Sequence, residues 1–155
     1  MATTIEARLA ALGVEIPDAA APAANYVSVM RHGDLLYVSG QLPMRDGTLA
    51  YRGRLGGDVT VDVGQEAARL CAINILAQAK SALNGDLERI RQIVRITGFV
   101  ASAESFSEQH LVVNGASDFL AEALAERGRH ARAAVGVAAL PLDAAVEIDA
   151  IIAVA

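Results

Sequence analysis

The chain has 155 residues, of which 54% are hydrophobic and 20% are charged, and its formal net charge is −5. This composition excludes a disordered chain and a coiled coil, and the length favours one domain over residues 1–155. The acidic balance argues against a general nucleic-acid binder, whose surface is normally basic. The single cysteine fits a reducing compartment, and neither a signal peptide nor an apolar run of about 18 residues is seen. We therefore expect a cytoplasmic protein without a membrane segment.

The first half of the chain predicts two helices and a hairpin. In chain order, the expected elements are a short helix over 3–12, an extended connector over 17–24, paired strands over 26–31 and 34–39, and a long helix from 62 to about 84. Thr3 and Glu6 match a capping box for the short helix, and Asp62 stands in the cap position of the long one. His32 and Gly33 are expected to form the hairpin turn. The apolar stripe of the long helix consists of Ala68, Cys71, Ile75, Ala79 and Ala82.

The second half predicts a strand, a helix and two closing strands. The expected ranges are a strand over 90–101, a helix over 104–127 and a hairpin of strands over 131–140 and 145–154. This order favours an α+β fold with a mixed sheet and helices on one face. The strands are rich in Val, Ile and Ala on both alternations, so the other sheet face also needs cover. A symmetric oligomer would supply it, and the alternative is a helix layer on both faces.

Arg132 is a permanent charge in an otherwise apolar strand. Burying it costs several kcal/mol unless an anionic partner meets it or the side chain reaches water. On the last strand, Glu147 and Asp149 share one face. Two interpretations are open: an internal ion pair between Arg132 and one of these acids, or a site in which the carboxylate acts on water. Small residues on the face of Arg132 leave space for a ligand or another backbone, and these are Ala134, Gly136 and Ala138.

Common chemical motifs are absent from the sequence. We find no Walker loop, no dinucleotide fingerprint and no paired-cysteine metal site. His32, His110 and His130 lack the spacing of a helical zinc pair, and we expect them to be surface or hydrogen-bonded histidines. Cys71 lies on the apolar helix stripe and is expected to belong to the core.

Several blocks of the sequence, in their order and spacing, resemble the Rid family, also called the YjgF/YER057c/UK114 family. The blocks are Tyr26-Val27, residues 36–43, Val113-Asn114, residues 131–135 and residues 140–150. The resemblance begins near Asn25, which makes residues 1–24 an N-terminal extension and residues 25–155 the family core. It implies a chorismate-mutase-like α+β fold, assembled as a homotrimer with ligand clefts between subunits.

The resemblance also implies an activity and a set of site residues. Active members hydrolyse reactive 2-imino acids and their enamine tautomers to 2-keto acids and ammonia, without a metal or a bound cofactor. Arg132 would clamp the substrate carboxylate through two charge-assisted hydrogen bonds, and Glu147 would orient or activate water. Ser39 and Tyr26 would hydrogen-bond the water or the substrate. The remaining substrate-binding positions are Gly40, which allows close backbone approach, Asn114 and Ala134.

The sequence departs from the family pattern at several points. Ala134 stands where members commonly have a cysteine, and Ala24-Asn25 precedes Tyr26 in place of the usual Gly-Pro. The N-terminal helix, the arginine-bearing loop over 44–57 and residues 128–130 resemble additions to the compact form. The loop is expected either to cover the cleft or to be a solvated surface loop. These departures indicate a divergent subgroup.

Two other functions stay open at this point. A non-catalytic trimer that binds a metabolite carboxylate, as a sensor or partner module, would need Arg132 but not Glu147. Endoribonuclease activity, known in some members, is the weaker alternative, because the acidic balance and the lack of a histidine pair do not suit phosphodiester chemistry. The sequence does not identify the physiological substrate or ligand for the imine hydrolase, the endoribonuclease or the binding protein.

Overall fold

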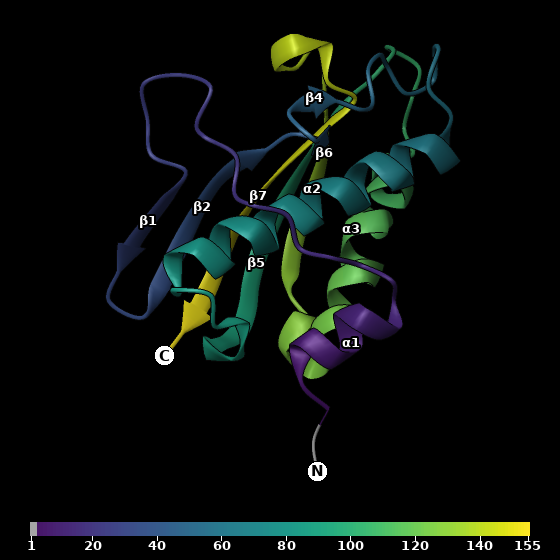
Figure 1. The fold of residues 1–155 in the computed structure, drawn as a ribbon. Helices are drawn as coiled ribbons and strands as arrows, with labels where there is room; N and C mark the ends of the chain where they lie inside the picture. Colours follow the sequence, from purple (N-terminus) through teal and green to yellow (C-terminus); the bar gives the residue numbers. More distant parts are fainter. Residues whose placement is uncertain (1–2) are drawn as a thin grey trace.

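The computed structural model describes residues 3–155 as a five-stranded sheet with its helices packed on one side (Figure 1). The helices are α1 (Ile5–Ala11), α2 (Val61–Ala82) and α3 (Gln109–Leu124). The sheet strands are β1 (Val29–His32), β2 (Leu35–Gln41), β5 (Ile90–Ala101), β6 (Ala131–Val137) and β7 (Val146–Val154), and β3 (Met44–Arg45) and β4 (Thr48–Leu49) form a small separate hairpin. Short 3₁₀ turns occupy Leu87–Arg89, Ala125–Gly128 and Pro141–Asp143.

The strand order is β1-β2-β7-β5-β6, with β5 and β6 parallel and the other pairs antiparallel. The expected hairpin between the last two strands is therefore wrong, because β7 lies between β2 and β5 and does not touch β6. The parallel pair needs a crossover connection, and α3 supplies it. The α+β class and the mixed sheet are confirmed.

The hydrophobic core lies between the sheet and the helices. Alternate residues of β7 point into it, and all five of them are buried: Val146, Ile148, Ala150, Ile152 and Val154. The expected stripe of α2 packs there too, since Ala68, Cys71, Ile75 and Ala79 are fully buried. The apolar stripe of the helix, with its 3.6-residue period, and the alternate residues of the strand thus pack together in one layer of the core.

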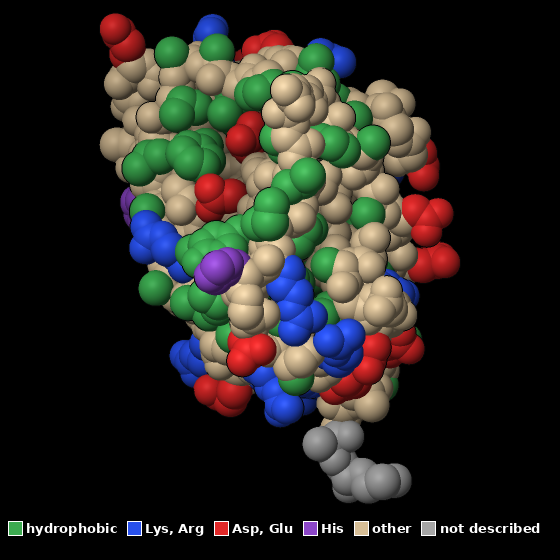
Figure 2. All heavy atoms as spheres, turned by 90° about the vertical axis from the view of Figure 1, so that its left-hand side faces the viewer, with side chains coloured by type: hydrophobic (Ala, Val, Ile, Leu, Met, Phe, Trp, Pro, Cys, Tyr) green, Lys and Arg blue, Asp and Glu red, His purple; other side chains and the backbone are tan. Residues whose placement is uncertain are grey.

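The opposite face of the sheet carries no helix within residues 3–155. Met30, Tyr37, Ile151 and Arg95 lie side by side across four strands of it, and Tyr37 is 43% exposed. Figure 2 looks at the β1–β2 side and shows hydrophobic side chains gathered toward the edge away from the helices, with acidic groups among them. One-sided helical cover is confirmed, and the alternative of helices on both faces is wrong.

The helix caps differ from the sequence prediction by one or two residues. Thr4 caps α1 with its hydroxyl, in place of Thr3, and Thr60 caps α2, in place of Asp62. Asp62 lies in the first turn of α2, where its negative charge interacts favourably with the positive end of the helix dipole. A threonine hydroxyl with extended backbone serves as the cap at both helices, one residue after the expected cap of α1 and two residues before that of α2.

Other boundaries are shifted as well, for example at the hairpin turn and at the start of α3. The hairpin turn is Gly33-Asp34, since His32 already pairs with Leu35 and Gly33 has φ +60°. Helix α3 starts at Gln109 rather than at 104, because residues 103–106 form a hydrogen-bonded turn before it. The strand over 90–101 has the expected bounds. Among the helices of the described chain, none is long and apolar enough to cross a bilayer.

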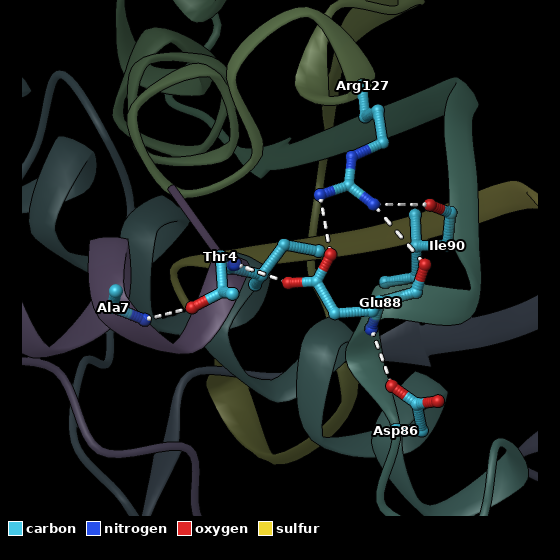
Figure 3. Close-up of polar contacts among 7 residues, drawn as sticks. Thr4, Ala7, Asp86, Glu88, Ile90 and Arg127 are labelled. Atoms are coloured by element: carbon cyan, nitrogen blue, oxygen red, sulfur yellow. Dashed lines mark hydrogen bonds and ion pairs between the residues drawn. The ribbon is translucent and has the colours of Figure 1, made fainter. Parts of the chain in front are cut away.

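Helix α1 is fastened to the rest of the chain at Glu88 (Figure 3). The Glu88 carboxylate accepts the backbone N–H of Ile5 at 2.5 Å and the Arg127 guanidinium at 3.0 Å. Arg127 also donates to the carbonyls of Glu88 and Ile90. The hydrogen bond from Ile5, followed by the contribution of Arg127, lowers the pKa of Glu88. One carboxylate thus joins α1, the start of β5 and the turn after α3.

Candidate functional site

Arg132 lies on β6, an outer strand of the sheet, and its side chain points to the helix side. Its neighbour in register is Ile96, which is fully buried in the core. The guanidinium donates to the Ser117 hydroxyl at 2.9 Å and to the His110 carbonyl at 2.8 Å, both on α3. Within residues 3–155 no carboxylate forms an ion pair with it. Arg132 is thus half-buried among neutral partners.

The internal ion pair considered for Arg132 is wrong. Glu147 lies in one row with Phe99 and Val135, and this row is three residues along β5 from the row of Ile96 and Arg132. The two rows that bear Arg132 and Glu147 project from opposite faces of the sheet, and β5 separates their strands.

The guanidinium retains capacity for an anion. It carries five N–H donors, and the two bonds to α3 use two of them. In the described chain the remaining three have no partner. A carboxylate binds best to two parallel N–H groups. Arg132 is thus a cation held in place that still has N–H donors available for a carboxylate.

A histidine and an asparagine complete what we call the Arg132 group: Arg132, Ser117, His130, His110 and Asn114. His130 Nε2 lies 2.8 Å from the Ser117 hydroxyl, and its Nδ1 lies 2.6 Å from the Gly128 carbonyl. This confirms the expectation of a hydrogen-bonded histidine. Burial lowers the pKa of His130, and the nearby charge of Arg132 adds to the effect. Asn114 is half-buried and lies one turn of α3 from both His110 and Ser117.

Glu147 belongs to the uncovered face and is half-buried there. Burial raises the pKa of its carboxyl, and the neighbouring charge of Asp149 raises it further. Gly40 lies against this carboxylate, where a Cβ atom would overlap it. The irregular pairing of β2 with β7 between Val38 and Gln41 brings the Gly40 backbone to that position. A carboxyl with a raised pKa suits a general base.

Ser39 and Tyr26 lie on the same side as Glu147. The Ser39 hydroxyl donates to the Val27 carbonyl at 2.8 Å, and the Tyr26 phenol accepts the Ala23 N–H at 3.4 Å. Both residues line an open groove of about 480 Å³. We use the name Glu147 group for Glu147, Asp149, Gly40, Ser39 and Tyr26.

Two polar residues of this groove were missed in the sequence. Arg95 and Thr97 line it beside Asp149. The signal was present, since they occupy one alternation of β5 while Ile96 and Gly98 on the other alternation are buried. Reading the two alternations of that strand separately would have found them.

The small residues beside Arg132 do not leave an empty space. Ala134 packs against the core and lies next to Gly98 in register. The Val113 side chain of α3 lies so close to Gly98 that a Cβ atom there would overlap it. Gly136 faces the Gln109 side chain. Helix α3 therefore lies over this part of the face, and a contact between Ala134 and the substrate stays a prediction.

Two other expectations concern the loop and the lone thiol. The loop over 44–57 is tied to the segment before β7, because Arg54 donates to the Ala138 carbonyl at 2.7 Å and Arg52 to the Leu142 carbonyl at 2.9 Å. The loop is thus fastened at two points although most of its residues are exposed, and a part in covering the cleft stays a prediction. The Cys71 thiol is buried, and burial raises its pKa well above the ordinary value, which confirms a core residue.

Comparison with known proteins identifies the family. A family model described as "YjgF/chorismate_mutase-like, putative endoribonuclease" matches residues 6–152. The chain belongs to the Rid/YjgF family. The match begins within α1, earlier than Asn25, where we expected the resemblance to begin. The family's fold agrees with the mixed sheet and one-sided helices found above.

Three relatives place the chain within this family. Protein TCP17 of Trypanosoma cruzi is 50% identical over 149 residues, which are 96% of this chain and 92% of that protein. The structure of Atu1372 from Agrobacterium tumefaciens is 58% identical with a TM-score of 0.92, over 97% of this chain and 92% of that one. The structure of E. coli TdcF with bound serine is 27% identical with a TM-score of 0.62, over 88% and 94%. The chain is closer in shape to Atu1372 than to TdcF, as a divergent subgroup would be.

Proposed function

We propose that this protein hydrolyses reactive 2-imino acids and their enamine tautomers to 2-keto acids and ammonia. The observation that carries the proposal is the Arg132 guanidinium, which two neutral partners hold, with three donors left over and no carboxylate paired to it within residues 3–155. Family membership supports it. So does the serine bound to TdcF, since serine bears the carboxylate and the nitrogen that a 2-imino acid also bears.

The site is proposed to lie between two subunits of a homotrimer. The Arg132 group and the Glu147 group project from opposite faces of one sheet, so one copy of the chain cannot join them around a small substrate. The uncovered apolar face around Tyr37 supports assembly, because a patch of this kind is expected to be covered in water. In this arrangement Arg132 of one subunit faces Glu147 of its neighbour.

The chemistry follows from the residue types. Arg132 and Asn114 bind the substrate carboxylate, and Ser39 and Tyr26 orient the attacking water. The Glu147 carboxylate takes a proton from this water as its oxygen bonds to the carbon of the protonated imine, and the electron pair of the C=N bond moves to nitrogen. Glu147 then passes the proton to nitrogen. The Glu147 carboxylate next takes the proton of the new hydroxyl group as the C–N bond breaks, which releases the keto acid and ammonia. Glu147 finally passes this proton to the ammonia, and its carboxylate is restored.

The test uses imino acids generated in solution by an amino-acid oxidase, with ammonia release as the readout. Wild-type protein is expected to accelerate the release. Arg132→Ala should lower kcat/KM about 10²-fold or more, because the substrate carboxylate loses its charged partner. Arg129→Ala is the matched control, since Arg129 is 72% exposed and its ion pair with Glu126 lies on the surface. Equal rates for wild type and Arg132→Ala would contradict the role of Arg132, and a wild type without any acceleration would contradict the reaction.

One observation favours a second candidate, a trimer that binds a metabolite carboxylate without turnover. The Arg132 group is complete by itself, since Ser117 and the His110 carbonyl hold Arg132 without any help from Glu147. Calorimetry with a 2-keto acid would separate the two functions. Binding that is lost in Arg132→Ala, kept in Glu147→Gln and accompanied by no turnover of any imine would favour the binding protein.

A further inference from the structure

We propose that Ser117 and His130 are positioning residues that fix the Arg132 guanidinium for the substrate carboxylate. The proposal rests on the proposed function in one respect, the identity of the anion that Arg132 binds. Its structural basis is a hydrogen-bonded chain that runs from Arg132 through the Ser117 hydroxyl and the His130 ring to the Gly128 carbonyl.

The two ends of this chain fix the direction of its bonds, and the neutral state of His130 fixes the bond between them. A guanidinium can only donate, so the Ser117 oxygen accepts from Arg132. A carbonyl can only accept, so the proton on His130 is at Nδ1, bonded to Gly128. Nε2 is then the acceptor in neutral His130, and the Ser117 hydroxyl donates to it. The chain therefore requires one tautomer of His130, and burial of the ring favours the neutral form.

The far end of the chain is rigid. Gly128 packs so closely on the backbone of Leu120 that a Cβ atom would not fit. Gln92 of β5 donates to the carbonyls of Glu126, Arg127 and Arg129, at 3.1, 3.3 and 2.5 Å. The turn that bears Gly128 and leads into His130 is thus fastened to both α3 and β5.

This rigidity bears directly on the proposed role of Arg132. A long side chain that is ordered only when substrate arrives costs binding affinity, whereas one that is already held does not. A bidentate bond to a carboxylate also needs the guanidinium plane in one orientation. Without the Ser117 hydroxyl, the His110 carbonyl alone would hold the guanidinium, and it could turn about that single contact.

The test compares Ser117→Ala with Ser117→Thr, which keeps the hydroxyl. We expect Ser117→Ala to raise both the KM for the imine and the Kd for a 2-keto acid about three- to tenfold, with kcat changed less than about twofold, because a bound carboxylate itself orients Arg132. Ser117→Thr should restore most of the affinity. A Ser117→Ala protein with wild-type KM and Kd, or one that loses kcat at unchanged KM, would overturn the proposal.

Nitrogen NMR of His130 gives a readout that needs no activity. The wild-type protein near neutral pH should show a protonated Nδ1 and an unprotonated Nε2, and in Ser117→Ala the proton should stay on Nδ1, bonded to Gly128, while the Nε2 resonance shifts because its hydroxyl donor is gone. A protonated Nε2 in the wild type would overturn the hydrogen-bonded chain. If the wild type binds no keto acid and hydrolyses no imine, the proposed function fails, and the tautomer of His130 still decides whether the chain exists.

Discussion

At the scale of single residues, the two charged groups of the proposed site are stabilised in different ways. Arg132 keeps its charge and finds neutral acceptors on α3. Glu147 has a raised pKa, because burial and the charge of Asp149 both disfavour its ionised form. A fixed cation for binding and a carboxyl able to exchange a proton are the two parts that imine hydrolysis needs.

Glu147→Gln is expected to lower kcat roughly 10²-fold, because the amide cannot take a proton from water. In the wild type, the rate should rise with pH through a value above 4.5, the ordinary pKa of a glutamate. Asp149→Asn is the matched variant, and it should keep most of the rate while moving that rise to lower pH, since one cause of the raised pKa is removed. A pH profile that Asp149→Asn leaves unchanged would contradict the assignment of Glu147 as the base.

The same shift makes a prediction for stability. The folded-state pKa of Glu147 lies above its unfolded value, so the folded protein binds the proton more tightly. Its contribution to stability is present below pH 4.5 and is lost as pH rises through the raised pKa. Thermal unfolding of Glu147→Gln should lack this loss.

At the scale of elements, α1 is held by the buried side chains of Ile5 and Leu9 and by the Glu88 carboxylate, and the Glu88 contact should be measurable by itself. Glu88→Ala removes the acceptor of the Ile5 N–H and the ion pair with Arg127. We expect a loss of about 1 kcal/mol, since the pair is partly exposed, and faster hydrogen exchange over residues 5–11. The pKa of Glu88 is lowered, so its stabilisation is present above pH 4.5 and is lost as pH falls through the lowered value.

Glu6→Gln is the matched control for this experiment. Glu6 of α1 also forms an ion pair, with Lys80 of α2 at 3.9 Å, but the Glu6 side chain is 67% exposed. Its removal should leave the unfolding free energy and the exchange of α1 nearly unchanged. A similar effect of both substitutions would show that Glu88 has no special part in docking α1.

The elements also show what a sequence can and cannot predict. The β-branched run of β5 predicts its bounds, and the alternation in β7 predicts that Glu147 and Asp149 share a face. Alternation does not tell which strands are neighbours, and for this reason the pairing of β6 with β7 was wrong. Ser117 lies 15 residues from Arg132 in the chain, and helical periodicity places it on a face of α3 without showing that β6 lies against that face.

At the scale of the whole molecule, one subunit holds both halves of the proposed site but cannot join them. The helices cover one face of the sheet, and Met30, Tyr37 and the Glu147 group lie on the other. In the proposed trimer this face meets the edge strand β6 of a neighbour. Assembly is then part of the activity, because each cleft needs side chains from two chains.

Mixing two inactive variants tests this shared site most directly. Arg132→Ala and Glu147→Gln proteins are to be unfolded together in equal amounts and refolded, with ammonia release from imino acids as the readout. We expect about a quarter of the wild-type rate, because about one cleft in four would join an intact Arg132 to an intact Glu147. Each variant refolded alone should stay inactive. A mixture no more active than its two components, formed from trimers shown to contain both chains, would contradict the account.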